Sequence, residues 1–168
     1  MDTIVRNAAI NDYEEVCKLF KLLDLHHFEL DSVNFQSFDG APRPRELFES
    51  YLTDSKKVLF VAQNKSELVG FANCHVTSSP PYPIFKPRRF VEVSNIFVSP
   101  AFQKHGLGKL LMNKAKDWAK SLNITTLSVT VYSSNERAVE FYNNLNFVSQ
   151  KQSMELCIKI PTLRGDDI

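Results

Sequence analysis

The 168-residue sequence predicts a mixed α/β fold, in which helices cover both faces of a mostly antiparallel central sheet. A short polar link joins the apolar runs at residues 58–63 and 68–77, and this spacing favours an antiparallel hairpin. Farther on, a strand-like run, a helical pattern and a second strand-like run follow one another, which is the order of a parallel βαβ unit. The length fits one domain, so we expect residues 1–168 to form a single unit.

The N-terminal part is expected to form a short strand over residues 3–8 and then a helix that reaches about His26. Asp12, with Glu15 three residues later, matches a capping box at the start of that helix. Residues 24–43 lack regular apolar spacing, so they are interpreted as a long loop or a broken helix.

The remaining elements follow from apolar periodicity and from prolines. The four prolines within residues 78–87 predict an extended loop, because proline cannot donate to a sheet ladder. The other expected elements are a helix from Pro44, a strand over 90–98, a helix over 108–122, a strand over 127–131, a helix from Asn135 to about 145, a strand over 147–160 and a tail over 161–168.

Composition narrows the class of function. Twenty basic and nineteen acidic residues leave a net charge of +1, which disfavours a nucleic-acid partner. The three cysteines, Cys17, Cys74 and Cys157, lack metal-ligand spacing, so we expect no metal and a reducing cytoplasm. No apolar run approaches ~18 residues and the first residues hold no signal-like core, so neither a membrane span nor secretion is expected.

The run Gln103-Lys104-His105-Gly106-Leu107-Gly108 stands between an expected strand and an expected helix. Two glycines one residue apart let main-chain N–H groups approach a phosphate without interference from a Cβ atom. The positive end of the helix dipole adds to this attraction. The run therefore predicts an anion-binding turn.

Two common glycine signatures do not fit this turn. The dinucleotide fingerprint requires a third glycine where Leu111 stands. The phosphate loop of nucleotide triphosphatases requires a glycine at Gln103 and a hydroxyl at Leu110. The pattern that remains is Q-x-x-G-x-G.

In this pattern the turn resembles the acetyl-CoA pyrophosphate loop of the GNAT superfamily of N-acetyltransferases. Ile96-Phe97-Val98-Ser99-Pro100 and the turn together are similar to motif A of that family. The stretch Asn135-Glu136-Arg137-Ala138-Val139-Glu140-Phe141-Tyr142 is similar to motif B. The family's closing Gly-Phe is replaced by Asn146-Phe147, and asparagine is the commonest substitute for a left-handed glycine. The resemblance covers about residues 57–160.

The resemblance implies a sheet that splays between its fourth and fifth strands and receives the pantetheine of acetyl-CoA there. It implies transfer of an acetyl group from acetyl-CoA, as cosubstrate, to a primary amine of a small molecule, peptide or protein by direct attack in a ternary complex. The alternative is a non-catalytic regulatory module that binds acyl-CoA. The implied cofactor-binding residues are Ile96, Phe97, Val98, Gln103, Lys104, His105, Gly106, Leu107, Gly108, Lys109, Asn135, Ala138 and Tyr142.

Two residues are implied as catalytic. Tyr142 occupies the motif B position that gives a proton to the sulfur of CoA, although it also fits a core aromatic. Glu92 lies on a strand and is the candidate general base, although a paired or solvent-facing role fits equally well. Many relatives carry an acidic pair where this chain has Ser94-Asn95, which disfavours a strongly cationic acceptor.

The acceptor pocket and the assembly have less support from motifs. We expect residues 24–43, the loop at 78–87 and the strand around Glu92 to form the acceptor pocket. The expected last strand, at 147–160, offers an edge through which a homodimer can form.

Overall fold

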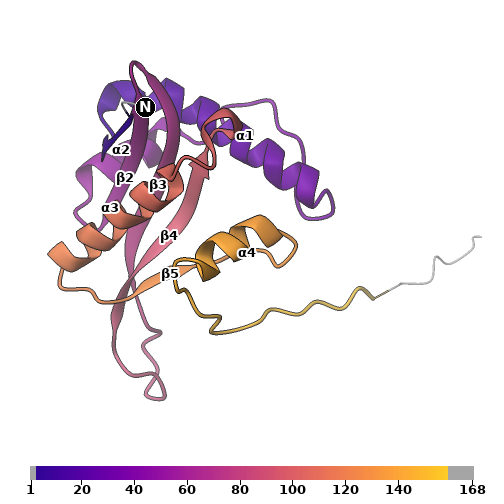
Figure 1. Cartoon of the computed structure of the whole chain (residues 1–168). Coiled ribbons are helices and arrows are strands. Elements are labelled where there is room, and N and C mark those ends of the chain that lie inside the picture. Colours follow the sequence, from indigo (N-terminus) through magenta and orange to yellow (C-terminus); the bar gives the residue numbers. More distant parts are fainter. Residues whose placement is uncertain (1–2, 159–168) are drawn as a thin grey trace, which may run out of the picture.

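The computed structural model describes residues 3–158, which form one sheet with helices on either side (Figure 1). The elements in chain order are β1 (Thr3–Asn7), η1 (Ile10–Asp12), α1 (Tyr13–Leu30), α2 (Arg45–Thr53), β2 (Lys57–Asn64), β3 (Glu67–Ser78), β4 (Arg89–Val98), η2 (Pro100–Phe102), α3 (Leu107–Ser121), β5 (Leu127–Val129) and α4 (Glu136–Asn143).

The sheet has five strands in the order β1-β2-β3-β4-β5. The first four strands are antiparallel to their neighbours, and β5 runs parallel to β4 across the α3 crossover. The expected hairpin and the expected βαβ unit are both confirmed, and with them the mixed α/β class.

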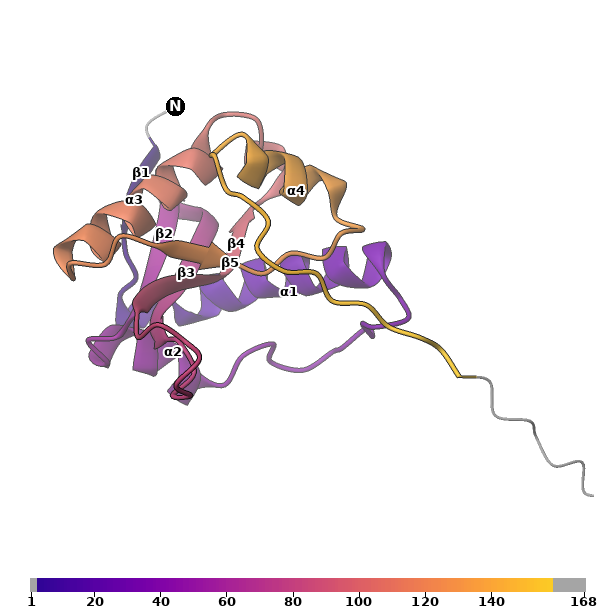
Figure 2. The same ribbon diagram turned by 90° about the horizontal axis from the view of Figure 1, so that it is seen from below.

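Helices bury the two faces of the sheet in two separate cores (Figure 2). On one face, α3 and α4 pack on the sheet through fully buried side chains such as Leu111 and Met112. On the other face, α1 and α2 pack on the sheet, and the ring of Phe20 lies 4.2 Å from that of Phe71. Apolar residues at helical spacing produce each buried stripe.

β4 and β5 separate partway along their length. Their pairing runs only from Val91 opposite Leu127 to Val93 opposite Val129, whereas β4 continues to Val98. Among residues 3–158, the end of β4 thus has β3 on one side and no strand on the other, which confirms the predicted splay between the fourth and fifth strands.

A bulge interrupts β4 just where this gap begins. Asn73 of β3 pairs with Asn95, but its neighbour Cys74 pairs with Val93, so Ser94 is an extra residue on β4. Such a bulge shifts the alternation of side chains. As a result, Val93 and Ile96 both face the α3 side of the sheet.

Helix α1 is longer than its apolar periodicity indicated. It continues past His26 to Leu30, and the N–H of Asp31 donates to the carbonyl of His27. The carboxylate of Asp31 then accepts from the N–H groups of Val33 and Asn34, which ends the helix in a turn. The expected long loop is therefore shorter than 24–43: residues 24–30 complete α1, and 31–43 form a loop without helix.

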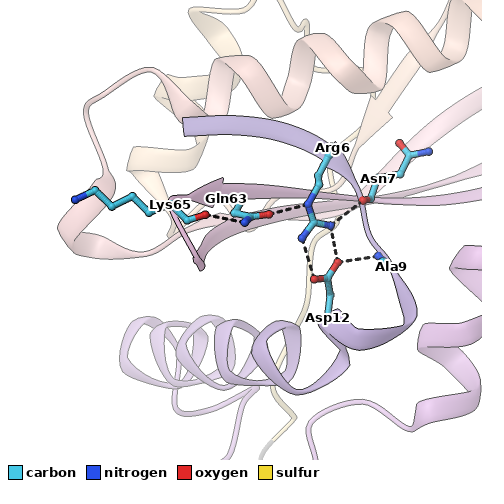
Figure 3. Close-up of polar contacts among 6 residues, drawn as sticks. All are labelled: Arg6, Asn7, Ala9, Asp12, Gln63 and Lys65. Atoms are coloured by element: carbon cyan, nitrogen blue, oxygen red, sulfur yellow. Dashed lines mark hydrogen bonds and ion pairs between the residues drawn. The ribbon is translucent and has the colours of Figure 1, made fainter. Parts of the chain in front are cut away.

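The capping box at Asp12 is not formed. Its carboxylate accepts from both terminal nitrogens of Arg6, at 2.7 and 2.9 Å, and from the N–H of Ala9 at 2.7 Å (Figure 3). It therefore makes no cap hydrogen bond with α1, and Glu15 pairs with Lys18 instead. A nearby guanidinium competes successfully for a carboxylate because hydrogen bonds between two charged groups are strong.

The strand expected at 147–160 is absent over its described part. Residues 147–158 have no regular secondary structure, and residues 159–160 lie outside the described residues, as does the expected tail at 161–168. Val148, Met154, Leu156 and Ile158 are all at least 75% exposed. The segment has strand composition, but within residues 3–158 it pairs with no strand, so composition alone does not make it a strand.

Candidate functional site

A cleft of about 1480 Å³ lies where β4 and β5 separate. Its walls are the end of β4, the turn before α3, the helix α4 and the C-terminal half of α1 with the loop that follows it. The implied site residues that line it are Ile96, Phe97, Val98, Gln103, Lys104, Gly106, Leu107, Gly108, Lys109, Asn135, Ala138 and Tyr142. His105 and Glu92 are the two that do not line it.

The turn before α3 presents a row of free main-chain donors. In the described part of the chain, none of the N–H groups from Lys104 to Lys109 donates to a backbone or side-chain acceptor, whereas the next N–H, of Leu110, donates to Gly106. Lys104 and Gly106 are both left-handed, with φ of 63° and 78°. Alternating left-handed residues gather N–H groups into an anion-binding concavity. The helix dipole of α3 points its positive end at the same place.

Gln103 fixes this turn to the end of β4. Its side-chain nitrogen donates to the carbonyl of Val98 at 2.9 Å, and its side-chain oxygen accepts from Arg137 of α4 at 3.4 Å. Gln103 thus joins the strand, the turn and α4, and we assign it a bracing role in the cleft.

Gly108 lets α3 and α4 approach each other. A Cβ atom at Gly108 would lie 3.2 Å from the ring of Phe141, closer than most such contacts. Phe141 precedes Tyr142 on α4, so the start of α3 and the tyrosine are held by one packing contact.

Asn135 caps α4. Its side-chain oxygen accepts from the N–H of Ala138 at 3.1 Å, as expected for an N-cap. The amide nitrogen of its side chain makes no hydrogen bond within residues 3–158 and can donate to a ligand in the cleft.

Tyr142 is buried at the wall of the cleft, with 9% of its surface exposed. Its ring packs edge-on against Phe141 and Phe147, at centroid distances of 5.3 and 5.5 Å. Burial raises the pKa of its phenol to about 12, so the hydroxyl stays protonated at neutral pH.

The end of α4 is fixed by Asn146, whose φ of 63° is the left-handed conformation expected of the residue that replaces the family's glycine.

Glu92 lies on β4 before the bulge and beside His75 of β3. A carboxylate oxygen of Glu92 is 3.9 Å from Nε2 of His75, and Nδ1 of the same ring is 3.0 Å from the hydroxyl of Ser94. Ser94 does line the cleft. Glu92 therefore reaches the cleft only through two other side chains.

Sequence reasoning missed an aromatic wall on the α1 side of the cleft. His27 stacks on Phe35 at 5.0 Å, and Phe35 meets Tyr132 edge-on at 5.3 Å. Burial lowers the pKa of His27 and favours its neutral form. His27 and Phe35 come from α1 and the loop after it, whereas Tyr132 follows β5, so no local pattern could have grouped the three.

Residues 24–43 contribute to the cleft as expected, whereas the loop at 78–87 does not line it. Arg43 pairs with Asp24 at 3.1 Å and covers the ring of Phe20 at 4.4 Å.

Over residues 3–158, no cluster of three potential metal ligands is present. No helix in that range has the length and hydropathy of a membrane span.

The fold is that of a known family. Residues 23–147 match the model of the acetyltransferase (GNAT) family, and the chain belongs to that family. An uncharacterized N-acetyltransferase of Methanocaldococcus jannaschii is 26% identical over 155 residues, which is 84% of this chain and 66% of that relative. The chain thus matches just under two thirds of the length of this curated relative.

Solved structures have the same fold. A tetramutant of a Bacillus halodurans protein superposes with a TM-score of 0.85 at 25% identity, over 92% of this chain and 99% of that one. An aminoglycoside N-acetyltransferase in complex with CoA superposes with a TM-score of 0.71 at 16% identity, over 94% of this chain and all of that one. At that identity the second likeness concerns the fold alone.

Proposed function

We propose that this chain transfers the acetyl group of acetyl-CoA to a primary amine of a small molecule, peptide or protein, by direct attack in a ternary complex. One observation carries the proposal: five of the six residues with free main-chain N–H groups between Lys104 and Lys109 line the same cleft as Tyr142, and His105 is the exception. The donors suit the pyrophosphate of CoA. The structural relative that holds CoA supports the same cosubstrate.

The gap beside the end of β4 is the proposed site of the pantetheine. Ile96, Phe97 and Val98 line the cleft past the point where β5 stops pairing. An extended amide chain placed there is hydrogen-bonded as a strand would be. The pyrophosphate then lies at the turn and the thioester lies farther along the cleft.

The proposed reaction needs no covalent enzyme intermediate. The neutral amine attacks the thioester carbonyl carbon, a C–N bond forms and the C–S bond breaks. Tyr142 donates its proton to the departing thiolate, and the phenolate that remains is reprotonated from the surrounding solvent. Such a donor contributes about 10²- to 10⁴-fold to the rate.

Glu92 is proposed to assist deprotonation of the amine through His75 and Ser94, with His75 as the group that takes the proton. In this route the amine loses its proton to the Ser94 hydroxyl, which passes a proton to His75, beside which the carboxylate of Glu92 stabilises the imidazolium. We expect Glu92→Gln and His75→Gln each to lower kcat and to leave the Kd for acetyl-CoA nearly unchanged, because each change removes a group from this proton route. If neither variant lowers kcat, the amine loses its proton to water instead.

We further propose a cytoplasmic location and a homodimer. Cys17, Cys74 and Cys157 are all free thiols, as in reducing compartments. The exposed apolar side chains of the 147–158 segment support association with a second copy. Light scattering of the full chain and of a chain ending at residue 147 tests the dimer, because only the full chain is expected to form one.

The alternative is a regulatory module that binds acyl-CoA without turnover. Acetyl transfer to a panel of amines separates the two functions, with acetyl-CoA binding measured by calorimetry in parallel. If acetyl-CoA binds and no amine is acetylated by the parent protein, the regulatory module is the better description.

A further inference from the structure

A second and smaller cavity, of about 150 Å³, lies between α1, α2 and the sheet. It shares three lining residues with the large cleft, namely Arg43, Ser94 and Asn95. The two cavities are therefore neighbours at the β4 bulge, with these three residues between them. A cavity of about this volume accommodates a single benzene ring.

Asn73 supplies an unpaired polar atom to this small cavity. The side chain is 5% exposed and its nitrogen donates to the hydroxyl of Tyr51 at 2.8 Å. Its side-chain oxygen is buried and accepts no hydrogen bond from residues 3–158. A buried acceptor without a partner is costly and uncommon in folded proteins. A ligand that brings one donor would satisfy it.

The other walls of the small cavity are mainly aromatic and aliphatic. Phe48 and Tyr13 meet edge-on at 5.4 Å, and Phe20 lies under the guanidinium of Arg43. No carboxylate is among its described lining residues, whereas Asp24, Glu29, Asp31 and Glu140 line the large cleft. An ammonium group is thus better accommodated in the cleft, and an uncharged ring is better accommodated in the small cavity.

We propose that the small cavity holds the end of the acceptor, and that the acceptor is a primary amine with one aromatic ring that carries a hydrogen-bond donor. The ring enters between α1 and the sheet, and its hydroxyl or N–H donates to the side-chain oxygen of Asn73. The amine remains in the large cleft beside the Ser94 bulge. This assignment rests on the proposed acetyl transfer and adds the class of the acceptor.

Three probe amines, all with one aromatic ring, test the hydrogen-bond donor, and methylamine, which has no ring, serves to test the ring. Tyramine carries a phenol hydroxyl, 4-methoxyphenethylamine has a methyl ether in place of that hydroxyl, and phenethylamine has neither the hydroxyl nor the ether. We expect kcat/KM for tyramine to exceed that for the other two by about 10- to 100-fold, since one buried hydrogen bond is gained or lost. Equal values for the three amines would overturn the proposal.

Two variants localise the effect. Asn73→Leu keeps the side-chain size and removes the acceptor, so the preference for tyramine should fall at least tenfold while activity with phenethylamine is kept. Cys17→Phe fills the small cavity from α1, so activity with all three probes should fall while activity with methylamine is kept. Thermal unfolding confirms that each variant is folded. A tyramine preference that survives both changes would overturn the proposal.

A binding measurement separates this proposal from the proposed function. Calorimetry of tyramine and phenethylamine with the CoA-saturated protein needs no turnover. Tighter binding of tyramine in the parent, lost in Asn73→Leu, supports the cavity even if no acetyl transfer occurs. If a crystal soaked in tyramine holds only water at Asn73, the acceptor class proposed here is wrong.

Discussion

The side chain of Gln103 donates to the main-chain carbonyl of Val98 over 2.9 Å, across the corner where β4 gives way to the turn before α3. The contact fixes the free N–H groups of the turn relative to the strand end that is proposed to hold the pantetheine. Gln103 is thus a bracing residue whose effect on the ligand passes through the main chain.

Gln103→Leu should therefore weaken acetyl-CoA binding without abolishing catalysis. One lost hydrogen bond is worth about 1 kcal/mol, so we expect the Kd for acetyl-CoA to rise about fivefold with a small change in kcat. Calorimetry and steady-state kinetics measure the two effects. Arg137→Met, which removes only the longer 3.4 Å contact to Gln103, serves as the comparison and should raise the Kd less.

Gly106 and Gly108 should respond to alanine for different reasons. Gly106 has a φ of 78° and nothing within 4 Å of its would-be Cβ, so Gly106→Ala should cost about 1–2 kcal/mol of conformational strain. Gly106→Asn should recover part of this, because asparagine tolerates left-handed backbone. Urea unfolding of both variants measures the difference, and equal losses would contradict the strain explanation.

Gly108→Ala should instead act through Phe141, whose ring would be 3.2 Å from the new methyl group. We expect the double variant with Phe141→Leu to be less destabilised than the sum of the two single variants, because the smaller side chain leaves room for the methyl group. Additive losses of unfolding free energy would show that the methyl group does not meet Phe141.

Tyr142→Phe should lower kcat by about 100-fold or more and leave the Kd for acetyl-CoA nearly unchanged, because only proton donation is lost. Since burial raises the pKa of the phenol to about 12, the donor is protonated throughout the usual assay range. Tyr82→Phe is a matched control, because Tyr82 lies on the 78–87 loop outside the cleft and is 66% exposed. Equal kcat values in the two variants would exclude Tyr142 as the donor.

The Arg6–Asp12 pair predicts a specific loss of stability in acid. Hydrogen bonding from Arg6 holds the pKa of Asp12 below its usual value, so the pair stabilises the fold fully above about pH 4. That contribution is lost as the pH falls through the lowered pKa of the folded state. Asp12→Asn should cost about 1 kcal/mol at neutral pH and make the acid limb of stability shallower.

Urea unfolding between about pH 2 and pH 7 measures this limb. Asp117→Asn is the control, since Asp117 makes only an exposed contact with Lys120 at 3.7 Å and should leave the acid limb unchanged. The interpretation fails if the Asp12 and Asp117 variants have the same acid limb as the parent.

Local patterns in the sequence were sufficient to predict the turn and most of the sheet. The anion-binding turn could be expected because two glycines precede a helix, and Gly106 has the positive φ that glycine readily adopts. The contact of Gly108 with Phe141 depends on α4 and could not be expected from the turn itself. The left-handed conformation of Asn146 followed from its place where the resembling family has a glycine. The hairpin of β2 and β3 followed from strand runs separated by a short polar link.

Features that depend on distant partners could not be predicted in this way. Residues 147–158 look like a strand, but a strand requires a neighbour, and the described chain provides none. The bulge at Ser94 shifts the alternation of side chains in the second half of β4 by one position. No residue type in this strand indicates a bulge. The carboxylate of Asp12 accepts hydrogen bonds from Arg6 and Ala9 because β1 and η1 place these residues side by side.

The contact between Gly108 and Phe141 restricts the length of the thioester that can serve as acetyl donor. It fixes the separation between the N–H groups at the start of α3 and the hydroxyl of the next residue on α4, Tyr142. The covalent chain between the pyrophosphate and the sulfur of CoA also has a fixed number of bonds. Under the proposed function, the protein therefore selects donors by length. In a thioester with a shorter or longer chain between pyrophosphate and sulfur, the sulfur would not reach the hydroxyl proton of Tyr142.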